Sequence, residues 1–358
     1  LGIITLVQIP AIAIQTAITK KVASKRDFNL DKFKRKSTLQ LVVVALIISL
    51  VFLLLRNQIA YISNIDVKYI PILSIALFIS LVTPVAKGFL LGLEKILSFN
   101  MVLLFETVLK FLLGYIAITN NFGLEMIILA FCIPSIITTA FVLPLIKSKG
   151  KEEDKKEIKL NYKHISLIFL TFLLLSVPFT LDLILVNPEV RASYGALSLM
   201  GKIVYFGSIT IASLMISKLS NSQKKARKKN LIISLIVSTL TGGIICLVYM
   251  LFTNEILQFV YDGAYLDIAK YIVSYSLSMI AYSTSYMIIT SQLVNDSYSH
   301  IYILFAVCVL QVVLYNLNNN TLNDAFINQV VIYGVLFILV LLILIFNIYK
   351  SNGKSKAK

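Results

Sequence analysis

The sequence predicts an all-α membrane protein, a polytopic transmembrane helical bundle. Of its 358 residues, 58% are hydrophobic and only 14% are charged, whereas a typical soluble protein has about 25% charged residues. Eleven long apolar stretches follow one another along the chain, and a helix crosses a bilayer core of ~30 Å with about 20 apolar residues. The loops between the stretches alternate between lysine-rich and lysine-poor. Together these three observations exclude a soluble fold.

The apolar stretches define the expected helices in chain order. We expect spans at residues 1–19, 39–55, 70–92, 99–118, 124–146, 164–187, 192–217, 231–252, 268–291, 301–316 and 326–349. Prolines interrupt several of them, at Pro10, Pro84, Pro134, Pro144 and Pro178. Because proline removes a backbone hydrogen bond, we expect kinks at these positions.

The charges of the loops predict the orientation in the cell membrane. Lys and Arg number eight in residues 20–38, seven in 147–163, six in 218–230 and four in the tail 350–358. The alternate loops hold only Arg56, Lys68 and Arg191. Lysine-rich loops stay in the cytoplasm, so we expect a multi-pass plasma-membrane protein with a cytoplasmic C-terminus. Anionic lipid heads account for the basic loops, and no nucleic-acid partner is needed.

The span order predicts two halves. The chain begins inside an apolar stretch, on the outer side by the alternation, so we expect that one helix precedes Leu1. We expect a truncated N-terminal bundle at 1–146, a charged cytoplasmic linker at 147–163, a C-terminal bundle at 164–349 and a basic tail at 350–358. Six helices on each side of the linker is a layout common among transporters, which bind substrate between such bundles.

Motifs for chemistry on cofactors or metals are absent from the sequence. It has three cysteines, each within an apolar stretch, and two histidines without a partner at metal-ligand spacing. We find no phosphate-binding glycine loop, nucleophile–base arrangement or dinucleotide fingerprint. We therefore expect no cofactor, no metal and no enzymatic activity.

Charged side chains at membrane depth are the first candidate site residues. Inserting one costs about 2.5–3.5 kcal/mol, so such residues usually face a protein interior or a cavity. Lys87 lies near the cytoplasmic end of its span, where it can extend to water, whereas Lys110 lies near the middle. Glu106 precedes Lys110 by four residues, a spacing that lets a helical pair meet. The pair either neutralises itself or lines a cavity and exchanges partners with a substrate or coupling ion.

Lys202 is a second mid-span cation, with no acidic neighbour on its own stretch. Asp182 on the preceding span is its best candidate partner. A buried Asp182–Lys202 pair and a ligand site are both compatible with the sequence.

Hydroxyl side chains concentrate in the span 268–291. Between residues 271 and 291, twelve of 21 carry a hydroxyl group, and Tyr275, Ser278 and Tyr282 fall on one helical stripe. Such a stripe either bonds to neighbouring helices or lines an aqueous cavity suited to sugars, since tyrosine has an apolar ring and a polar tip. Gln15 lies on a similar polar face of the first span.

Two segments carry a resemblance to a known family. LDLILVNPEVRASYGALSLMGKIVYFGSITIASLMISKLS (181–220) resembles the seventh and eighth helices of polysaccharide-biosynthesis flippases, the O-antigen-translocase-like members of the multidrug/oligosaccharidyl-lipid/polysaccharide exporter (MOP) superfamily. The family pattern is an Asp late in the seventh helix, a short outer turn and a Gly/Tyr/Ala cluster that opens the eighth helix. This pattern is matched by Asp182, Tyr194, Gly195 and Ala196, although the order here is Tyr-Gly-Ala where many members have Gly-x-Tyr. IQTAITKKVAS (14–24) is similar to the end of the family's second helix.

The resemblance implies two six-helix bundles that move a lipid-linked oligosaccharide, carried on a polyprenyl pyrophosphate, by alternating access. Lysine meets phosphate as a point charge. Lys202 and Lys110, with Lys87, would hold the pyrophosphate, and Tyr275, Ser278, Tyr282 and Gln15 would contact sugar. Asp182 and Glu106 would be an ion-coupling or structural pair. Its partners would be membrane lipids and glycan-assembly proteins. We expect the protein itself to be a monomer.

Two other functions are weighed. A cation-coupled multidrug exporter of the same superfamily would favour carboxylates in the cavity, whereas lysines outnumber them at depth. A glycan polymerase or glycosyltransferase would need a sizeable outer loop. The longest outer connections, 56–69 and 253–267, have about 15 residues each, and a solvated loop explains the acidic residues of the second.

Overall fold

A computed structural model gives the fold of the chain. It describes residues 2–24, 29–63, 66–146, 162–221, 224–295 and 297–356, and the side chains of 11–23, 29–61, 66–146, 166–208, 229–295 and 297–346. The described part is helical throughout, without strands, as the sequence predicts. It divides within one helix into two compact units, Ile3–Phe169 and Leu170–Lys358. The expected charged linker lies outside the described residues from 147 to 161.

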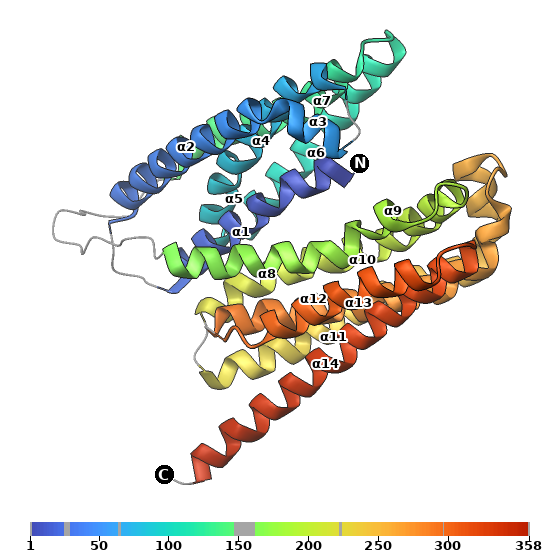
Figure 1. Ribbon diagram of the computed structural model, residues 1–358. Coiled ribbons are helices and arrows are strands. Elements are labelled where there is room, and N and C mark those ends of the chain that lie inside the picture. The colour runs from blue at the N-terminus through green and yellow to red at the C-terminus, as the bar shows by residue number, and fades with distance from the viewer. Residues whose placement is uncertain are drawn as a thin grey trace. The chain divides into compact units, whose positions relative to one another are not determined.

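Unit 1 consists of seven α-helices, one 3-10 helix and the first turns of an eighth α-helix within the described residues (Figure 1). They are α1 (Gly2–Ser24), α2 (Leu30–Leu54), α3 (Arg56–Ser63), η1 (Val67–Tyr69), α4 (Ile70–Val82), α5 (Pro84–Gly92), α6 (Ile96–Thr119), α7 (Leu124–Leu145) and the start of α8 (Tyr162–Thr180). Helix α4 packs between α2 and α7, and α6 packs along α7. A small core of Ile70, Leu73, Ile79, Ile128 and Cys132 joins α4 to α7.

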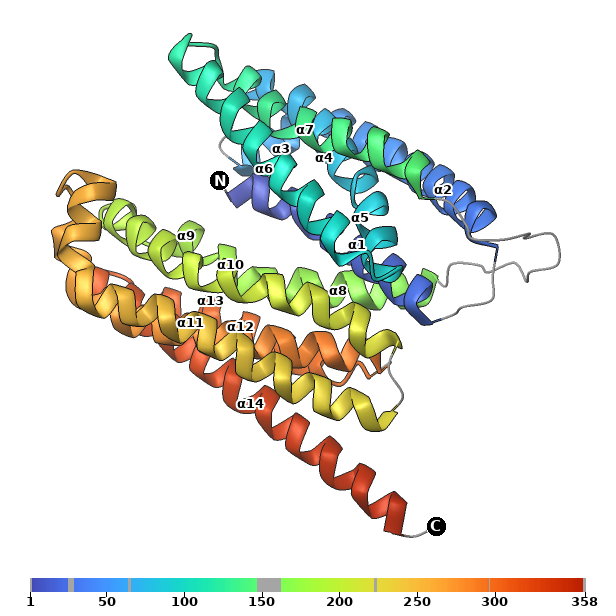
Figure 2. The same ribbon diagram turned by 180° about the vertical axis from the view of Figure 1, so that it is seen from behind.

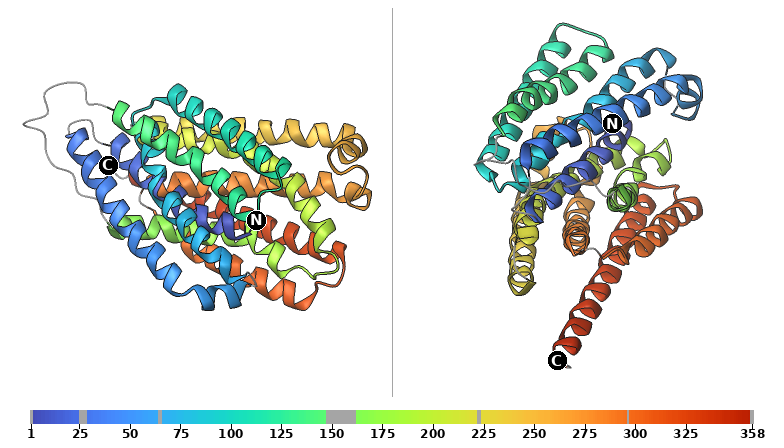
Figure 3. Two further views of the ribbon diagram at one scale, coloured as in Figure 1. Left: turned by 90° about the horizontal axis from the view of Figure 1, so that it is seen from above. Right: turned by 90° about the vertical axis from the view of Figure 1, so that its left-hand side faces the viewer.

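Unit 2 contains the rest of α8 and the later helices, which Figure 2 shows from behind. They are α9 (Asp182–Leu185), α10 (Arg191–Asn221), α11 (Lys224–Tyr261), η2 (Leu266–Ile268), α12 (Ala269–Val294), α13 (His300–Leu317) and α14 (Leu322–Lys356). Helix α12 is the centre of the unit, because α10, α11 and α14 all pack against it. The end of α14 extends past its neighbours (Figure 3).

The helices agree with the predicted spans. Eight of them, or merged pairs of them, are long and apolar enough to cross a membrane within the described residues. The predicted spans at 1–19, 164–187 and 192–217 fall on α1, on α8 with α9, and on α10. The span 70–92 breaks between Val82 and Pro84, and the span 164–187 breaks after Thr180, shortly past Pro178. Proline therefore divides both helices, whereas Pro134 and Pro144 lie inside continuous α7.

Glycine lets α1 approach α5 closely. A Cβ atom at Gly88 would lie 2.9 Å from Ile18 Cβ, and one at Gly92 would lie 2.6 Å from Val22 Cβ. The Thr19 hydroxyl donates a hydrogen bond to the Gly88 carbonyl oxygen across 3.2 Å. Small residues four apart allow such backbone contact between membrane helices. The contact fixes the face of α1 that carries Gln15 beside the short helix that carries Lys87.

Candidate functional site

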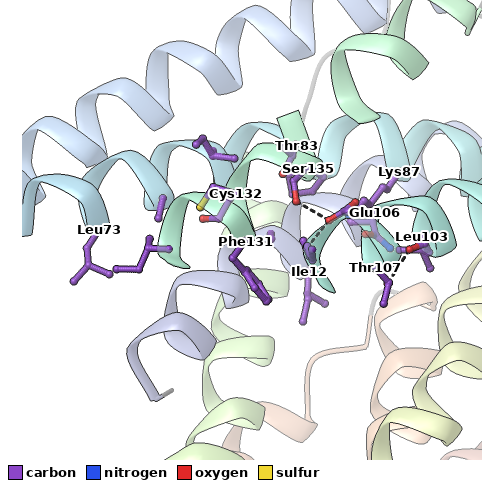
Figure 4. Close-up of a pocket in the computed structure, with 18 of the residues that line it drawn as sticks. Ile12, Leu73, Thr83, Lys87, Leu103, Glu106, Thr107, Phe131, Cys132 and Ser135 are labelled. Atoms are coloured by element: carbon purple, nitrogen blue, oxygen red, sulfur yellow. Dashed lines mark hydrogen bonds and ion pairs between the residues drawn. The ribbon is translucent and has the colours of Figure 1, made fainter. Parts of the chain in front are cut away.

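Unit 1 contains a partly open cavity of about 360 Å³. This cavity, called the Glu106 pocket below, lies among α1, α4, α5, α6 and α7. Its polar lining includes Gln15, Thr83, Lys87, Glu106, Lys110 and Ser135. In Figure 4, Thr83, Lys87, Glu106 and Ser135 lie together, and Leu73 and Phe131 belong to the apolar part of the lining. The size is within the usual range for small-molecule sites, about 300–1,000 Å³.

Glu106 is the centre of the polar side of the pocket. Its side chain is 4% exposed, and four side chains from three helices surround it. Oε1 lies 2.6 Å from Lys110 Nζ and accepts a 2.6 Å hydrogen bond from Ser135 Oγ (Figure 4). Oε2 lies 2.6 Å from Lys87 Nζ and 3.5 Å from Thr138 Oγ1. The predicted Glu106–Lys110 pair is confirmed.

The position of Lys87 differs from the expected one. From the sequence we expect Lys87 to extend toward water at the end of its span. In the structure it turns inward, its side chain is 15% exposed, and it pairs with Glu106. The break before Pro84 is the reason, because it starts the separate helix α5 three residues before Lys87. The break aims Lys87 at α6.

The electrostatics of the pocket are those of a cation-rich site. Two ammonium groups share one carboxylate, so the three residues together carry one net positive charge. Lys110 Nζ also lies 4.5 Å from the centre of the Phe131 ring, a favourable cation–π contact. Buried charges are stable only when paired, and here the pairing leaves one positive charge to attract an anion.

Asp182 forms a second polar cluster, in unit 2. Its side chain is fully buried and, within the described residues, accepts hydrogen bonds from neutral donors. Oδ1 accepts from the Leu183 N–H at 2.8 Å, and Oδ2 accepts from the hydroxyls of Tyr194 at 3.0 Å and Ser198 at 3.3 Å. Asp182 is therefore fixed between α9 and α10.

Hydroxyl and amide groups extend this cluster to the break in α8. The Tyr315 hydroxyl lies 3.2 Å from that of Tyr194 and 3.1 Å from Gln329 Oε1. Gln329 Nε2 donates a 2.6 Å hydrogen bond to the carbonyl oxygen of Pro178, to which Tyr333 also donates. The network satisfies a carbonyl group near the end of a proline-broken helix and joins α8, α10, α13 and α14.

Lys202 does not form an ion pair with Asp182, its candidate partner from the sequence. Among the described side chains, no carboxylate lies within ion-pair distance of its ammonium group. The residue is only 7% exposed, and its Nζ lies 4.8 Å from the centre of the Phe179 ring. Asp182 instead accepts hydrogen bonds from Tyr194, Ser198 and the Leu183 N–H. Lys202 is thus a buried cation with no ion-pair partner among the described side chains, and Asp182 is near enough to interact with it electrostatically.

The hydroxyl stripe of α12 packs inside unit 2. Tyr275, Ser278 and Tyr282 are all buried, and Tyr282 donates a 2.8 Å hydrogen bond to the Leu175 carbonyl oxygen of α8. The Tyr275 ring lies over Gly201, where a Cβ atom would be 2.3 Å from Tyr275 Cδ1. Tyr275 and Tyr282 thus contact neighbouring helices of unit 2, while Ser278 Oγ donates to the Tyr275 carbonyl oxygen of its own helix.

Sequence reasoning missed several polar partners. Ser135 and Thr138 lie on one face of α7, and Gln311 and Gln329 are mid-span amides, so their polarity inside apolar stretches was a usable signal.

His300 is buried at the start of α13, with Nδ1 3.0 Å from Gln292 Oε1 and Nε2 3.0 Å from Thr171 Oγ1. Within the described residues, no group of three or more His, Cys, Asp or Glu could hold a metal.

The helical fold is similar to that of solved transporter structures. A structure titled as the outward-facing conformation of a multidrug resistance MATE family transporter of the MOP superfamily aligns with 95% of this chain and 83% of its own, at 14% identity and a TM-score of 0.71. The crystal structure of a MATE protein in the bent conformation gives a TM-score of 0.75 at 14% identity over 100% of this chain and 86% of the other. The chain has the MATE transporter fold. Protein-family models and curated protein sequences give no match.

A third solved structure has a similar fold. It is a MOP superfamily transporter from Pyrococcus furiosus, whose title states that reverse polarity of the binding pocket suggests a different function. This chain aligns with it over 95% of its own length and 84% of the other, at 15% identity and a TM-score of 0.74. At this identity the likeness concerns the fold. Charge therefore has to be judged from the residues of each chain.

Proposed function

We propose that this protein is a membrane exporter that moves an anionic lipid-linked oligosaccharide, carried on a polyprenyl pyrophosphate, across the cell membrane by alternating access. The single observation that supports the substrate class most directly is the surplus of positive charge in the Glu106 pocket. Lys87 and Lys110 both lie 2.6 Å from Glu106, which can neutralise only one of them.

The lining of the pocket suits the head of such a lipid. Lysine binds phosphate as a point charge, and both ammonium groups already point into one cavity. Gln15, Thr83 and Ser135 add donors and acceptors for sugar hydroxyls, while Leu73, Ile79 and Ile128 give apolar walls. A head group would bind here while its polyprenyl tail stays in the bilayer, which lowers the barrier to crossing hydrocarbon.

In this proposal Lys202 is a second cation for the passing phosphates. The residue is buried, its ammonium group lies beside the Phe179 ring, and no carboxylate among the described side chains is within ion-pair distance of it. An unpaired buried charge is costly, so it is a favourable place for an anion to pass. Asp182 acts as a structural acceptor, because neutral donors from three residues hold it. The basic loops and the C-terminus would face the cytoplasm.

A cation-coupled multidrug exporter is the second candidate. It is favoured by the MATE fold of solved multidrug transporters and by a carboxylate, Glu106, in the pocket. Two lysines already occupy that carboxylate. A cationic drug would have to displace both of them from Glu106 and would then lie beside two ammonium groups, so the charge of the pocket opposes this function.

Translocation in proteoliposomes tests the proposal. The full-length protein would be reconstituted with a fluorescent prenyl-pyrophosphate oligosaccharide, and a membrane-impermeant quencher would report how much of it reaches the other leaflet. We expect wild-type protein to accelerate this exchange and Lys110→Gln to reduce it at least tenfold. Lys270→Gln, at an exposed lysine in unit 2, is the matched control and should keep the wild-type rate.

The same vesicles distinguish the two candidates. If the protein moves a cationic dye and leaves the anionic lipid in place, the multidrug function replaces the one proposed. If Lys110→Gln and Lys270→Gln reduce exchange of the anionic lipid equally, the Glu106 pocket is not its site.

A further inference from the structure

The charge balance of the Glu106 pocket sets a condition on any bound anion. With Glu106 ionised, its three charged groups sum to one positive charge. Glu106 is almost fully buried, and a buried charge left without compensation is strongly destabilising. The filled pocket is therefore most stable when its net charge is zero.

Two classes of lipid-linked sugar differ in this respect. A phosphodiester carries one negative charge and neutralises the pocket as it stands. A pyrophosphate diester carries two and would leave one negative charge in excess. The charge that can be removed is that of Glu106, because a carboxylate beside another anion favours its neutral form.

We propose that Glu106 takes up one proton when the pocket binds a pyrophosphate diester, and that it stays ionised when the pocket binds a phosphodiester. The inference rests on the proposed function, since it requires that the anion bind at this pocket. Lys87 and Lys110 turn from Glu106 to the phosphate oxygens. A proton from bulk water binds a Glu106 carboxylate oxygen, and no covalent bond of the ligand changes.

The neighbours of Glu106 can accommodate the neutral form. Ser135 Oγ lies 2.6 Å from Oε1 and Thr138 Oγ1 lies 3.5 Å from Oε2. A hydroxyl both donates and accepts, so Ser135 can receive a hydrogen bond from a protonated carboxyl after the lysines have moved. The acid then remains hydrogen-bonded within α6 and α7.

Other groups in the pocket do not offer an equivalent proton site. Among the described lining residues, α5 contributes the ammonium of Lys87, α6 that of Lys110, and α7 the thiol of Cys132. Helices α1 and α4 and the turn before α5 present only uncharged polar groups, from Gln15, Ser80 and Thr83. Both ammonium groups are already protonated and the thiol is neutral, so none of them can lower the negative charge of the filled pocket at neutral pH.

Calorimetry on the full-length protein tests this coupling. Binding heats of a short-chain prenyl-pyrophosphoryl-N-acetylglucosamine, a dianion, and of its prenyl-phosphoryl counterpart, a monoanion, would be measured in buffers of different ionisation enthalpy. The buffer dependence gives the protons bound per ligand. We expect about one proton for the dianion and none for the monoanion. By linkage, the affinity for the dianion should fall about tenfold for each unit of pH rise near neutrality.

Two variants assign the proton to Glu106. Glu106→Gln should bind the dianion with no proton uptake and with no pH dependence of affinity, while Glu106→Asp should restore the uptake. If wild-type protein binds the dianion without a proton, or if Glu106→Gln still takes one up, the inference is overturned while the proposed function stands. If neither lipid binds the wild-type protein, the proposed function fails first.

Discussion

Each unit contains a buried carboxylate near a lysine, but the partners that hold the carboxylate differ between the two units. In unit 1, Glu106 holds two lysines at 2.6 Å beside an open pocket. In unit 2, Asp182 is held by neutral donors, and Lys202 has an aromatic ring in place of an anion. Charged partners at a cavity can be exchanged for a charged ligand, whereas a packed hydrogen-bond network favours one arrangement. Both carboxylates are buried, so it is the charge of their partners that distinguishes the proposed binding site from the structural cluster.

Neutralising the lysines should show the largest contrast between the units. The double variant Lys87→Gln with Lys110→Gln leaves Glu106 buried without a cation, and losing the partner of a buried charge costs about 3–5 kcal/mol of unfolding free energy. Lys202→Gln removes a buried cation that has no ion-pair partner among the described side chains, so its unfolding free energy should not fall. Denaturant unfolding in detergent measures both. Equal losses of unfolding free energy would contradict the difference between the two lysine environments described above.

The Asp182 cluster is tested by paired substitutions. Asp182→Ala removes the acceptor for Tyr194, Ser198 and the Leu183 N–H, and each buried donor left unsatisfied costs about 1–3 kcal/mol. Asp182→Asn keeps an oxygen acceptor and should lose less stability, with most of the transport rate retained. An Asn variant that is fully stable but transports nothing would make Asp182 a coupling group and contradict its structural role.

Helix spacing around the pocket is the next comparison. Gly88→Ala would place a Cβ atom 2.9 Å from Ile18 Cβ and 3.0 Å from the Gln15 carbonyl oxygen, and such overpacking costs about 1–3 kcal/mol. Gly114→Ala on α6 meets no atom within 4 Å and should gain up to about 1 kcal/mol from helix propensity. Thermal unfolding compares the two. If Gly88→Ala is as stable as Gly114→Ala, α1 and α5 are not in close contact.

The smallest expected effect concerns one hydroxyl. Ser135→Ala removes the 2.6 Å hydrogen bond to Glu106 Oε1 and should cost about 0.5–1.5 kcal/mol, the net value of a typical hydrogen bond, because Glu106 keeps both lysines. Thr107→Val is the control, since that hydroxyl donates to the Leu103 carbonyl oxygen of its own helix. If Thr107→Val lost more unfolding free energy than Ser135→Ala, the Ser135 hydrogen bond would not stabilise Glu106 as described.

Local patterns predicted the helices and part of the site. Apolar length located the helices, proline located the breaks before α5 and after α8, and the spacing of Glu106 and Lys110 predicted their contact. Contacts between helices were beyond these patterns. Lys87 reaches Glu106 because a break and a glycine contact orient α5, and neither the direction of a side chain nor the partner it meets follows from periodicity. For the same reason the donors to Asp182 were not foreseen, and the sequence could not decide whether Lys202 pairs with Asp182.

A structure of the full-length protein with a bound short-chain prenyl-pyrophosphate sugar would test the central claim most directly. The account predicts that the phosphate oxygens lie within ion-pair distance of both Lys87 and Lys110 Nζ, with Glu106 displaced from them and still beside Ser135. A head group bound elsewhere, with both Glu106–lysine distances still at 2.6 Å, would contradict it.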